Sequence, residues 1–153
     1  MSIQRNQIAA LSLSAAAFVG ILTYEGYKEN AYIPVPGDVP TIGFGSTDGV
    51  KLGDRTNPVA AANRALVDVN QFEGAIKQCV KVPLYQYEYD AFVSLAYNIG
   101  SGAFCRSTLV KKLNKEDYAG ACYEILRWNK MGNQVLPGLT KRRQGEFVKC
   151  LGG

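Results

Sequence analysis

The chain has 153 residues, 47% of them apolar, and a formal net charge of +4 with no histidine. This length suffices for one domain with a hydrophobic core, and the lack of histidine excludes histidine-based catalysis and histidine metal ligands. We expect neither a metal nor a cofactor. The sequence has no Lys/Arg run with interleaved aromatic residues and no glycine-rich phosphate loop, so nucleic acid is not the expected ligand. The mild positive charge suits an acidic polymer, but it is also common in proteins that bind nothing charged.

Residues 6–24 are 19 consecutive residues without a charge, preceded by Arg5. This length is close to the roughly 18 apolar residues that indicate a membrane-spanning helix. Many of these residues are Ala, Ser or Gly, so we expect only marginal insertion. Three interpretations stay open. The stretch is a cleavable signal with its small-residue site at residues 15–17, a weak anchor that later leaves the membrane, or a buried first helix of a cytoplasmic protein.

The uncharged stretch ends at Tyr24, and Glu25 and Gly26 follow. Glycine is the residue best suited to end a helix in a left-handed cap, so we predict Glu25 in the last turn of a helix. At that end the helix dipole and apolar neighbours both favour the protonated acid. Such a carboxyl can serve as a general acid. The alternative for Glu25 alone is an exposed glutamate at a helix end.

Two short strands are predicted within residues 31–44, joined by the turn sequence Pro-Val-Pro-Gly-Asp that ends at Asp38. The second strand starts at Thr41, and its glycines allow a ligand to approach the backbone. Residues 50–52 are a candidate third strand. An acid at a helix end that faces a small sheet with Asp38 and Thr41 fits a cleft for splitting a glycosidic bond.

A long helix is predicted from Asn57, its N-cap, and Pro58, its first residue. Helical spacing places Glu73 on its solvated side. The predicted inward positions of this helix are Leu66, Val69, Phe72 and Ile76.

Four later helices are predicted from the same spacing. They are residues 85–99, a short helix that begins at Ser107 or Thr108, residues 115–128, and a last helix that starts near Thr140. Their predicted inward positions are Tyr85, Tyr89, Phe92, Ala96 and Ile99, then Tyr118, Cys122, Ile125 and Leu126, then Phe147 and Leu151.

The four cysteines are Cys79, Cys105, Cys122 and Cys150, and none belongs to a C-x-x-C pair. An even count permits two disulfides in an oxidising compartment, with three possible connectivities. We expect at least one disulfide because the N-terminal stretch indicates export, and our hypothesis pairs Cys105 with Cys122 and Cys79 with Cys150. The alternative is four buried thiols.

Several motifs together resemble the phage-type lysozymes, glycoside hydrolase family 24. They are E-G-Y-K-E-N-A-Y at residues 25–32, P-T-I-G-F-G-S-T at residues 40–47, N-x-G followed by S-T-L from Asn98, and W-N … L-P-G-L-x-x-R-R-x-x-E from Trp128. The resemblance covers most of residues 20–151. It implies an α+β, mainly helical, lysozyme-like fold with a small β-hairpin lobe, a larger helical lobe and a cleft between them.

The resemblance implies Glu25 as the catalytic acid and Thr41 as the hairpin threonine that positions water. The family places a catalytic aspartate two residues after the tyrosine that matches Tyr32, where this chain has Pro34. Asp38 is the nearby carboxylate, in a hairpin about one residue longer than the family's.

The implied substrate-binding residues are Tyr32, Asn98 and Arg142, with Arg143 as the alternative to Arg142 near the catalytic acid. On spacing alone, Asn98 could be a capping residue and the arginines a solvated basic helix face. Trp128 is the only tryptophan; a core position is the default, and packing on a sugar face is the alternative.

The implied activity is that of a peptidoglycan muramidase, a phage endolysin that hydrolyses the β-1,4 bond between N-acetylmuramic acid and N-acetylglucosamine and lyses the host. Carboxyls about 6.5–9.5 Å apart would predict inversion. One alternative is a lytic transglycosylase, which needs one glutamate and no base carboxylate. The other is a non-catalytic glycan-binding or membrane module.

The weak N-terminal anchor resembles that of the signal-arrest-release subgroup of these enzymes. It would divide the chain into an N-terminal segment, residues 1–24, and a catalytic domain, residues 25–153. We then expect a monomer that is exported, tethered to the inner membrane, and later released into the host periplasm.

Overall fold

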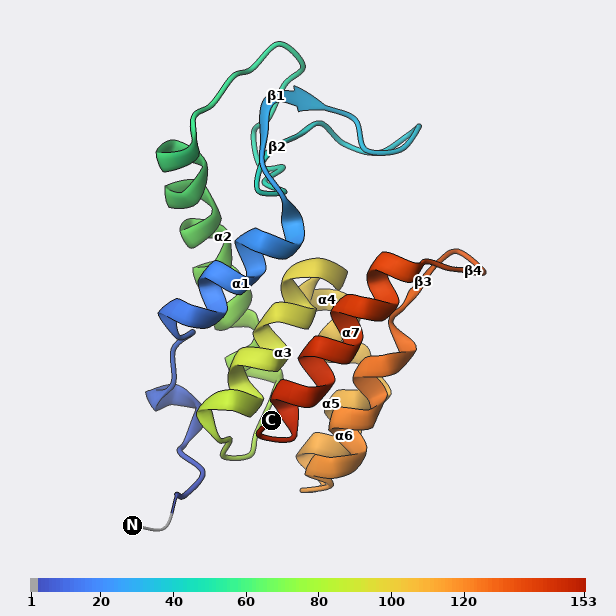
Figure 1. Cartoon of the computed structure of the whole chain (residues 1–153). Coiled ribbons are helices and arrows are strands. Elements are labelled where there is room, and N and C mark those ends of the chain that lie inside the picture. The colour runs from blue at the N-terminus through green and yellow to red at the C-terminus, as the bar shows by residue number, and fades with distance from the viewer. Residues whose placement is uncertain (1–2) are drawn as a thin grey trace. The chain divides into compact units, whose positions relative to one another are not determined.

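The computed structural model describes residues 3–153 (Figure 1). This part of the chain forms two compact units, one from Phe18 to Gln71 and one that joins the residues up to Ala17 with Phe72–Gly153. Seven α-helices and two small antiparallel sheets confirm the predicted mainly helical α+β class. The helices are α1 (Ala15–Glu25), α2 (Pro58–Cys79), α3 (Gln86–Ile99), α4 (Ser101–Arg106), α5 (Thr108–Asn114), α6 (Tyr118–Glu124) and α7 (Pro137–Cys150); the 3-10 helices are η1 (Ile8–Ala10) and η2 (Ile125–Arg127); the strands are β1 (Lys28–Tyr32), β2 (Thr41–Gly43), β3 (Lys130–Met131) and β4 (Gln134–Val135).

The uncharged N-terminal stretch is not one long helix. It contains the short η1, a non-helical part at residues 11–14, and then α1. A single first helix over residues 6–24 is therefore wrong for the first half of the stretch, because the backbone of residues 11–14 forms hydrogen bonds with side chains of α2 and α3. No helix within residues 3–153 is long and apolar enough to cross a membrane.

Strands β1 and β2 form the predicted hairpin, with Tyr32 opposite Thr41. The first strand begins at Lys28, three residues earlier than predicted. The third strand predicted at residues 50–52 is wrong: these residues belong to a turn region, and the hairpin is extended by a bridge between Asn30 and Arg55.

Two predicted helix starts have observed side-chain caps, whereas the last helix begins at Pro137, before the predicted Thr140, and its N-cap Leu136 forms no side-chain cap bond. The N–H of Ala60 donates to Asn57 Oδ1 at 2.9 Å, and the N–H of Val110 donates to Ser107 Oγ at 3.3 Å. Ser107 rather than Thr108 is therefore the cap of α5. The predicted helix at residues 115–128 is shorter than expected, because its cap is the later residue Asp117.

The core of the second unit is built around α3, which packs beside α7 (Figure 1). Tyr89, Phe92 and Ala96 are fully buried, as predicted. Two residues that were predicted to point inward, Leu66 and Leu151, are exposed. Leu66 is exposed because its neighbour Ala65 lies on the buried side of α2 instead. Leu151 is exposed because it follows the last residue of α7. The buried side of α2 consists of Ala61, Ala65, Val69, Glu73 and Ile76.

Glu73 is buried, not solvated as predicted. Its Oε1 accepts hydrogen bonds from the N–H of Leu13 and from the hydroxyl of Tyr89, both at 2.7 Å. Burial, followed by the hydrogen bond to Glu73, strongly raises the pKa of Tyr89. Tyr89 thus remains a hydrogen-bond donor to this carboxylate.

Both disulfides lie in the unit that contains α3. Cys79, at the end of α2, pairs with Cys105 of α4, and Cys122 of α6 pairs with Cys150, the last residue of α7. The expectation of at least one disulfide is confirmed, but the hypothesised pairing is wrong. The fold brings each pair to Cα separations of 5.6 and 5.7 Å, which a disulfide requires.

Candidate active site

Glu25 is the last residue of α1, as predicted. Gly26 has a φ of 71°, and its N–H donates to the carbonyl of Leu22 at 3.0 Å, so the left-handed helix end is confirmed. The side chain of Glu25 is half-buried. A Cβ atom on Gly45 would lie 3.1 Å from Glu25 Oε2, so the carboxylate lies directly against the Gly45 backbone.

Gly45 belongs to a tight turn that the T-I-G-F-G-S-T motif forms. Ile42 and Ser46 exchange both backbone hydrogen bonds across this turn, at 2.9 and 3.0 Å. Gly43 and Gly45 have φ values of 65° and 90°, which residues with a Cβ rarely adopt. The hydroxyl of Ser46 donates to Asp68 Oδ2 at 2.6 Å, which attaches the turn to α2. The motif therefore places the Gly45 backbone, which carries no side chain, beside Glu25.

The hairpin holds the other three candidates of this unit. Thr41 is 6% exposed, and its Oγ1 donates to the carbonyl of Val39 at 3.2 Å. Asp38 is exposed in the loop between β1 and β2, and its Oδ1 accepts the N–H of Val39 at 2.8 Å. Tyr32 ends β1 opposite Thr41 and is 37% exposed. In this structure Asp38 orders its own loop.

Arg142 and Arg143 are buried, so their interpretation as a solvated basic face is wrong. Arg142 contacts Glu146 through Nε at 3.0 Å and donates through Nη2 to the carbonyl of Ser94 at 3.2 Å. Arg143 Nη2 donates to Asn98 Oδ1 at 2.7 Å and lies 3.2 Å from Glu146 Oε1. Burial raises the pKa of Glu146 although both guanidinium groups act to lower it.

Sequence reasoning assigned no role to Glu146, which pairs with both arginines. The signal was available in the R-R-x-x-E spacing, because residues three and four apart lie on the same side of a helix. One carboxylate oxygen can therefore contact both arginines of α7.

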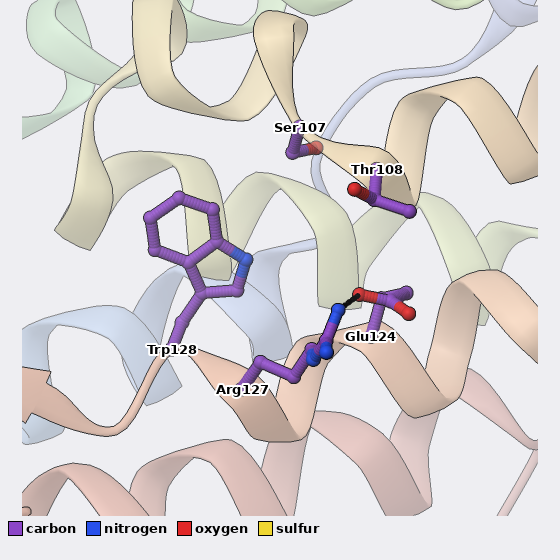
Figure 2. Close-up of a pocket in the computed structure, with 5 residues that line it drawn as sticks. All are labelled: Ser107, Thr108, Glu124, Arg127 and Trp128. Atoms are coloured by element: carbon purple, nitrogen blue, oxygen red, sulfur yellow. Dashed lines mark hydrogen bonds and ion pairs between the residues drawn. The ribbon is translucent and has the colours of Figure 1, made fainter.

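A pocket of about 290 Å³ opens beside η2 in the same unit (Figure 2). Its lining residues are Ser107, Thr108, Glu124, Arg127 and Trp128. The Trp128 indole and the Arg127–Glu124 pair lie across from the hydroxyls at the start of α5. The hydrogen bond from Lys112, at 2.8 Å, and that from Arg127, at 3.2 Å, lower the pKa of Glu124.

Trp128 also lines a second pocket of about 300 Å³. Its lining residues are Asn98, Ile99, Trp128, Lys130, Met131 and Leu139. Trp128 is half-buried at both pockets, so the default core position is wrong. Asn98 is exposed and is not the cap of α3, which is Gly100.

Comparison with known proteins identifies the class of enzyme. The sequence profile described as "Phage lysozyme" matches residues 22–146. The chain is 41% identical over 140 residues to an endolysin of Acyrthosiphon pisum secondary endosymbiont phage 1, covering 89% of this chain and 95% of that relative. It is 36% identical over 141 residues to a SAR-endolysin of Pseudomonas phage phiKMV, covering 90% and 87%.

Solved structures agree with this assignment. An endolysin from Escherichia coli O157:H7 phage FAHEc1 has a TM-score of 0.81 at 32% identity, covering 97% of this chain and 96% of that one. The muramidase domain of SpmX from Asticaccaulis excentricus has a TM-score of 0.85 at 28% identity, covering 92% and 98%. This chain belongs to the phage lysozyme family, and the predicted lysozyme-like fold is confirmed.

Proposed function

We propose that this chain is an endolysin, a muramidase that hydrolyses the β-1,4 bond between N-acetylmuramic acid and N-acetylglucosamine in peptidoglycan and so lyses the bacterial host. The observation that carries the site assignment is Glu25. It ends α1 inside the family-matched range, is half-buried, and lies against the Gly45 turn. A carboxyl in such a place is suited to protonate the leaving glycosidic oxygen.

The remaining roles are those that the family resemblance implies for residues of the hairpin, α3 and α7. Thr41, buried at the start of β2, positions the attacking water, and Asp38 is the second carboxylate. Tyr32 and Asn98 contact the glycan, and their exposed side chains leave room for it. Arg142 is held by Glu146 and supports the site. The active form is a monomer.

The test of the acid is the substitution Glu25→Gln in the full chain, assayed on isolated peptidoglycan. Loss of a general acid lowers the rate by about two to four orders of magnitude. The matched control is Glu29→Gln, which removes a carboxylate from β1 that pairs only on the surface with Arg55. Near-normal activity of Glu25→Gln, with an unchanged fold, would show that another residue is the acid.

The hairpin residues separate hydrolysis from the second candidate function, lytic transglycosylation. That candidate is favoured by Pro34 at the family's aspartate position and by the use of Asp38 in ordering its loop. If Thr41→Ala lowers the rate and Asp38→Asn does not, no second carboxylate is required. Product analysis then decides, because free reducing ends identify hydrolysis and anhydromuramic acid identifies transglycosylation.

We also propose that residues 6–24 tether the newly made protein to the inner membrane before release into the periplasm. The uncharged stretch and the relatives named SAR-endolysins support this. The tethered form must differ from the present structure, in which only α1 is an α-helix in this stretch. Leucines at Ala15, Ala16 and Ala17 make insertion more favourable, so the mutant should stay in the membrane fraction and lyse late. A wild-type protein that is never found in that fraction would contradict tethering.

A further inference from the structure

Residues 5–14, here called the N-terminal strap, bind to α2, to α3 and to the segment between these helices, mostly through backbone groups. Asn6 and Leu84 exchange both backbone hydrogen bonds, at 2.8 and 2.9 Å. The carbonyl of Leu11 accepts a hydrogen bond from the Lys77 ammonium group. The carbonyl of Ser12 accepts one from the side-chain amide of Gln86 at 2.8 Å. The strap is thus bound along most of its length.

Two buried carboxylates receive the C-terminal end of the strap. The N–H of Leu13 donates to Glu73 Oε1 at 2.7 Å. The N–H of Ser14 donates to Asp90 Oδ1 at 3.0 Å, and its hydroxyl donates to Asp90 Oδ2 at 2.7 Å. Glu73 is 9% exposed and Asp90 6%. If a buried carboxylate lost these donors, no hydrogen bond would offset its desolvation, and the folded state would be destabilised.

A third buried carboxylate, that of Glu88, pairs with Arg5 at the N-terminal end of the strap. Its Oε1 lies 2.8 Å from Arg5 Nε. The Arg5 guanidinium also lies over two aromatic rings, with its Cζ 3.5 Å from the centroid of Tyr118 and 4.3 Å from that of Tyr85. Cation–π contact and ion pairing act on the same group here. Arg5 is the single charge that precedes the uncharged stretch.

The bonds of the strap exclude a membrane helix. In an α-helix the N–H groups of Leu13 and Ser14 would donate to carbonyls four residues earlier, those of Ala9 and Ala10. A bilayer requires these internal bonds, because it offers no other partner. In the present structure the same two N–H groups donate to Glu73 and Asp90. Each of these two N–H groups can donate to a carbonyl of a membrane helix or to a carboxylate of the folded protein, but not to both.

We propose that Glu73, Glu88 and Asp90 form an intramolecular acceptor site for the N-terminal strap, and that binding to this site competes with the membrane for residues 5–14. The competition, though not the acceptor site, rests on the tethering proposed above. Small residues keep the insertion free energy of the stretch near zero. A few hydrogen bonds to charged acceptors are then enough to set the ratio of released to tethered protein.

The experiment changes the acceptor and leaves the strap sequence, and so its insertion propensity, unchanged. In full-length Asp90→Ala, the amides of Leu13 and Ser14 should exchange with solvent at least tenfold faster than in the purified wild type. In cells, the ratio of released to membrane-bound protein should fall roughly tenfold, the size expected for losing hydrogen bonds to a charged group. Glu124→Ala is the control, because it removes a buried carboxylate of the same unit that pairs with Lys112 and Arg127, neither of which belongs to the strap.

Each outcome has a defined meaning. Unprotected Leu13 and Ser14 amides in the wild type, or equal effects of Asp90→Ala and Glu124→Ala, would overturn the acceptor site. Protected amides that respond to Asp90→Ala, in a protein never found in the membrane fraction, would overturn tethering and the competition but support the acceptor site. Should Asp90→Ala fail to fold, the exposed Gln86→Ala supplies the test, because it removes donors to Ser12 and Asp90. It should shift both measurements in the same direction by less, and no shift would overturn the proposal.

Discussion

At the scale of single residues, the two glycines of the T-I-G-F-G-S-T turn have different neighbours. A Cβ on Gly43 would meet the Ala61 side chain at 2.9 Å, so this glycine allows the turn to approach α2. A Cβ on Gly45 would meet Glu25 Oε2 at 3.1 Å. Gly43 is thus required for packing, whereas Gly45 is required by the position of the candidate acid.

Gly45→Ala should therefore reduce activity by more than its effect on stability explains. The φ of 90° costs a residue with a Cβ about 1–2 kcal/mol, and the new methyl group would displace the Glu25 carboxylate. We expect at least a tenfold loss of muramidase activity in a protein that is still folded at assay temperature. Activity on isolated peptidoglycan and thermal unfolding measure the two effects.

The matched control for this prediction is Gly49→Ala. Gly49 also has a positive φ, 68°, but a Cβ there would meet no atom within 4 Å. We expect a similar loss of stability with activity retained. Equal activity losses in both variants would show that backbone strain, not contact with Glu25, is the cause.

At the scale of elements, Glu124 links α6 to its neighbours. It pairs with Lys112 of α5 at 2.8 Å and with Arg127 of η2 at 3.2 Å. Both hydrogen bonds lower its pKa in the folded state, that from Lys112 most. The folded protein therefore binds this proton less readily than the unfolded chain does.

A lowered pKa stabilises the folded state above the unfolded value, which is about 4.5 for glutamate. This contribution is lost as the pH falls through the lower, folded-state value. The stability difference between the wild type and Glu124→Gln should thus be constant near neutral pH, shrink below about pH 4.5, and vanish in stronger acid. Urea unfolding at a series of pH values measures it. A difference that does not change with pH would mean that the ion pairs do not contribute.

At the scale of the whole molecule, both disulfides join helices of one unit, α2 to α4 and α6 to α7. Their sequence separations are 26 and 28 residues. Loop-closure entropy depends only on the logarithm of loop length, so the two bridges should stabilise the fold equally.

We expect the double substitutions Cys79→Ser with Cys105→Ser, and Cys122→Ser with Cys150→Ser, to lower the free energy of unfolding by about 2–4 kcal/mol each. Urea unfolding without reductant measures this loss. Four free thiols in protein exported to the periplasm, detected by mass after alkylation, would contradict the pairing itself.

Features that depend on neighbours in sequence were predictable. The end of α1 at Glu25, the cap at Asn57 and the β1–β2 hairpin were each predicted and are observed, and the cap of α5 is one of the two residues predicted for it, Ser107. Their interactions connect residues three or four apart or join strands across a short loop, so the local sequence determines them. The residue types at Glu25 and Thr41 also marked the candidate site.

Only the tertiary structure decided the burial of charged groups. Glu73 was expected on a solvated helix face, but its partner Leu13 lies 60 residues away in sequence. The spacing of Arg142 and Arg143 suggested a solvated basic helix face, but in the structure they donate hydrogen bonds to Ser94 and Asn98 of α3. The strap and the disulfide pairing were missed for the same reason: they depend on which distant elements become neighbours, and helical or strand periodicity carries no information on this.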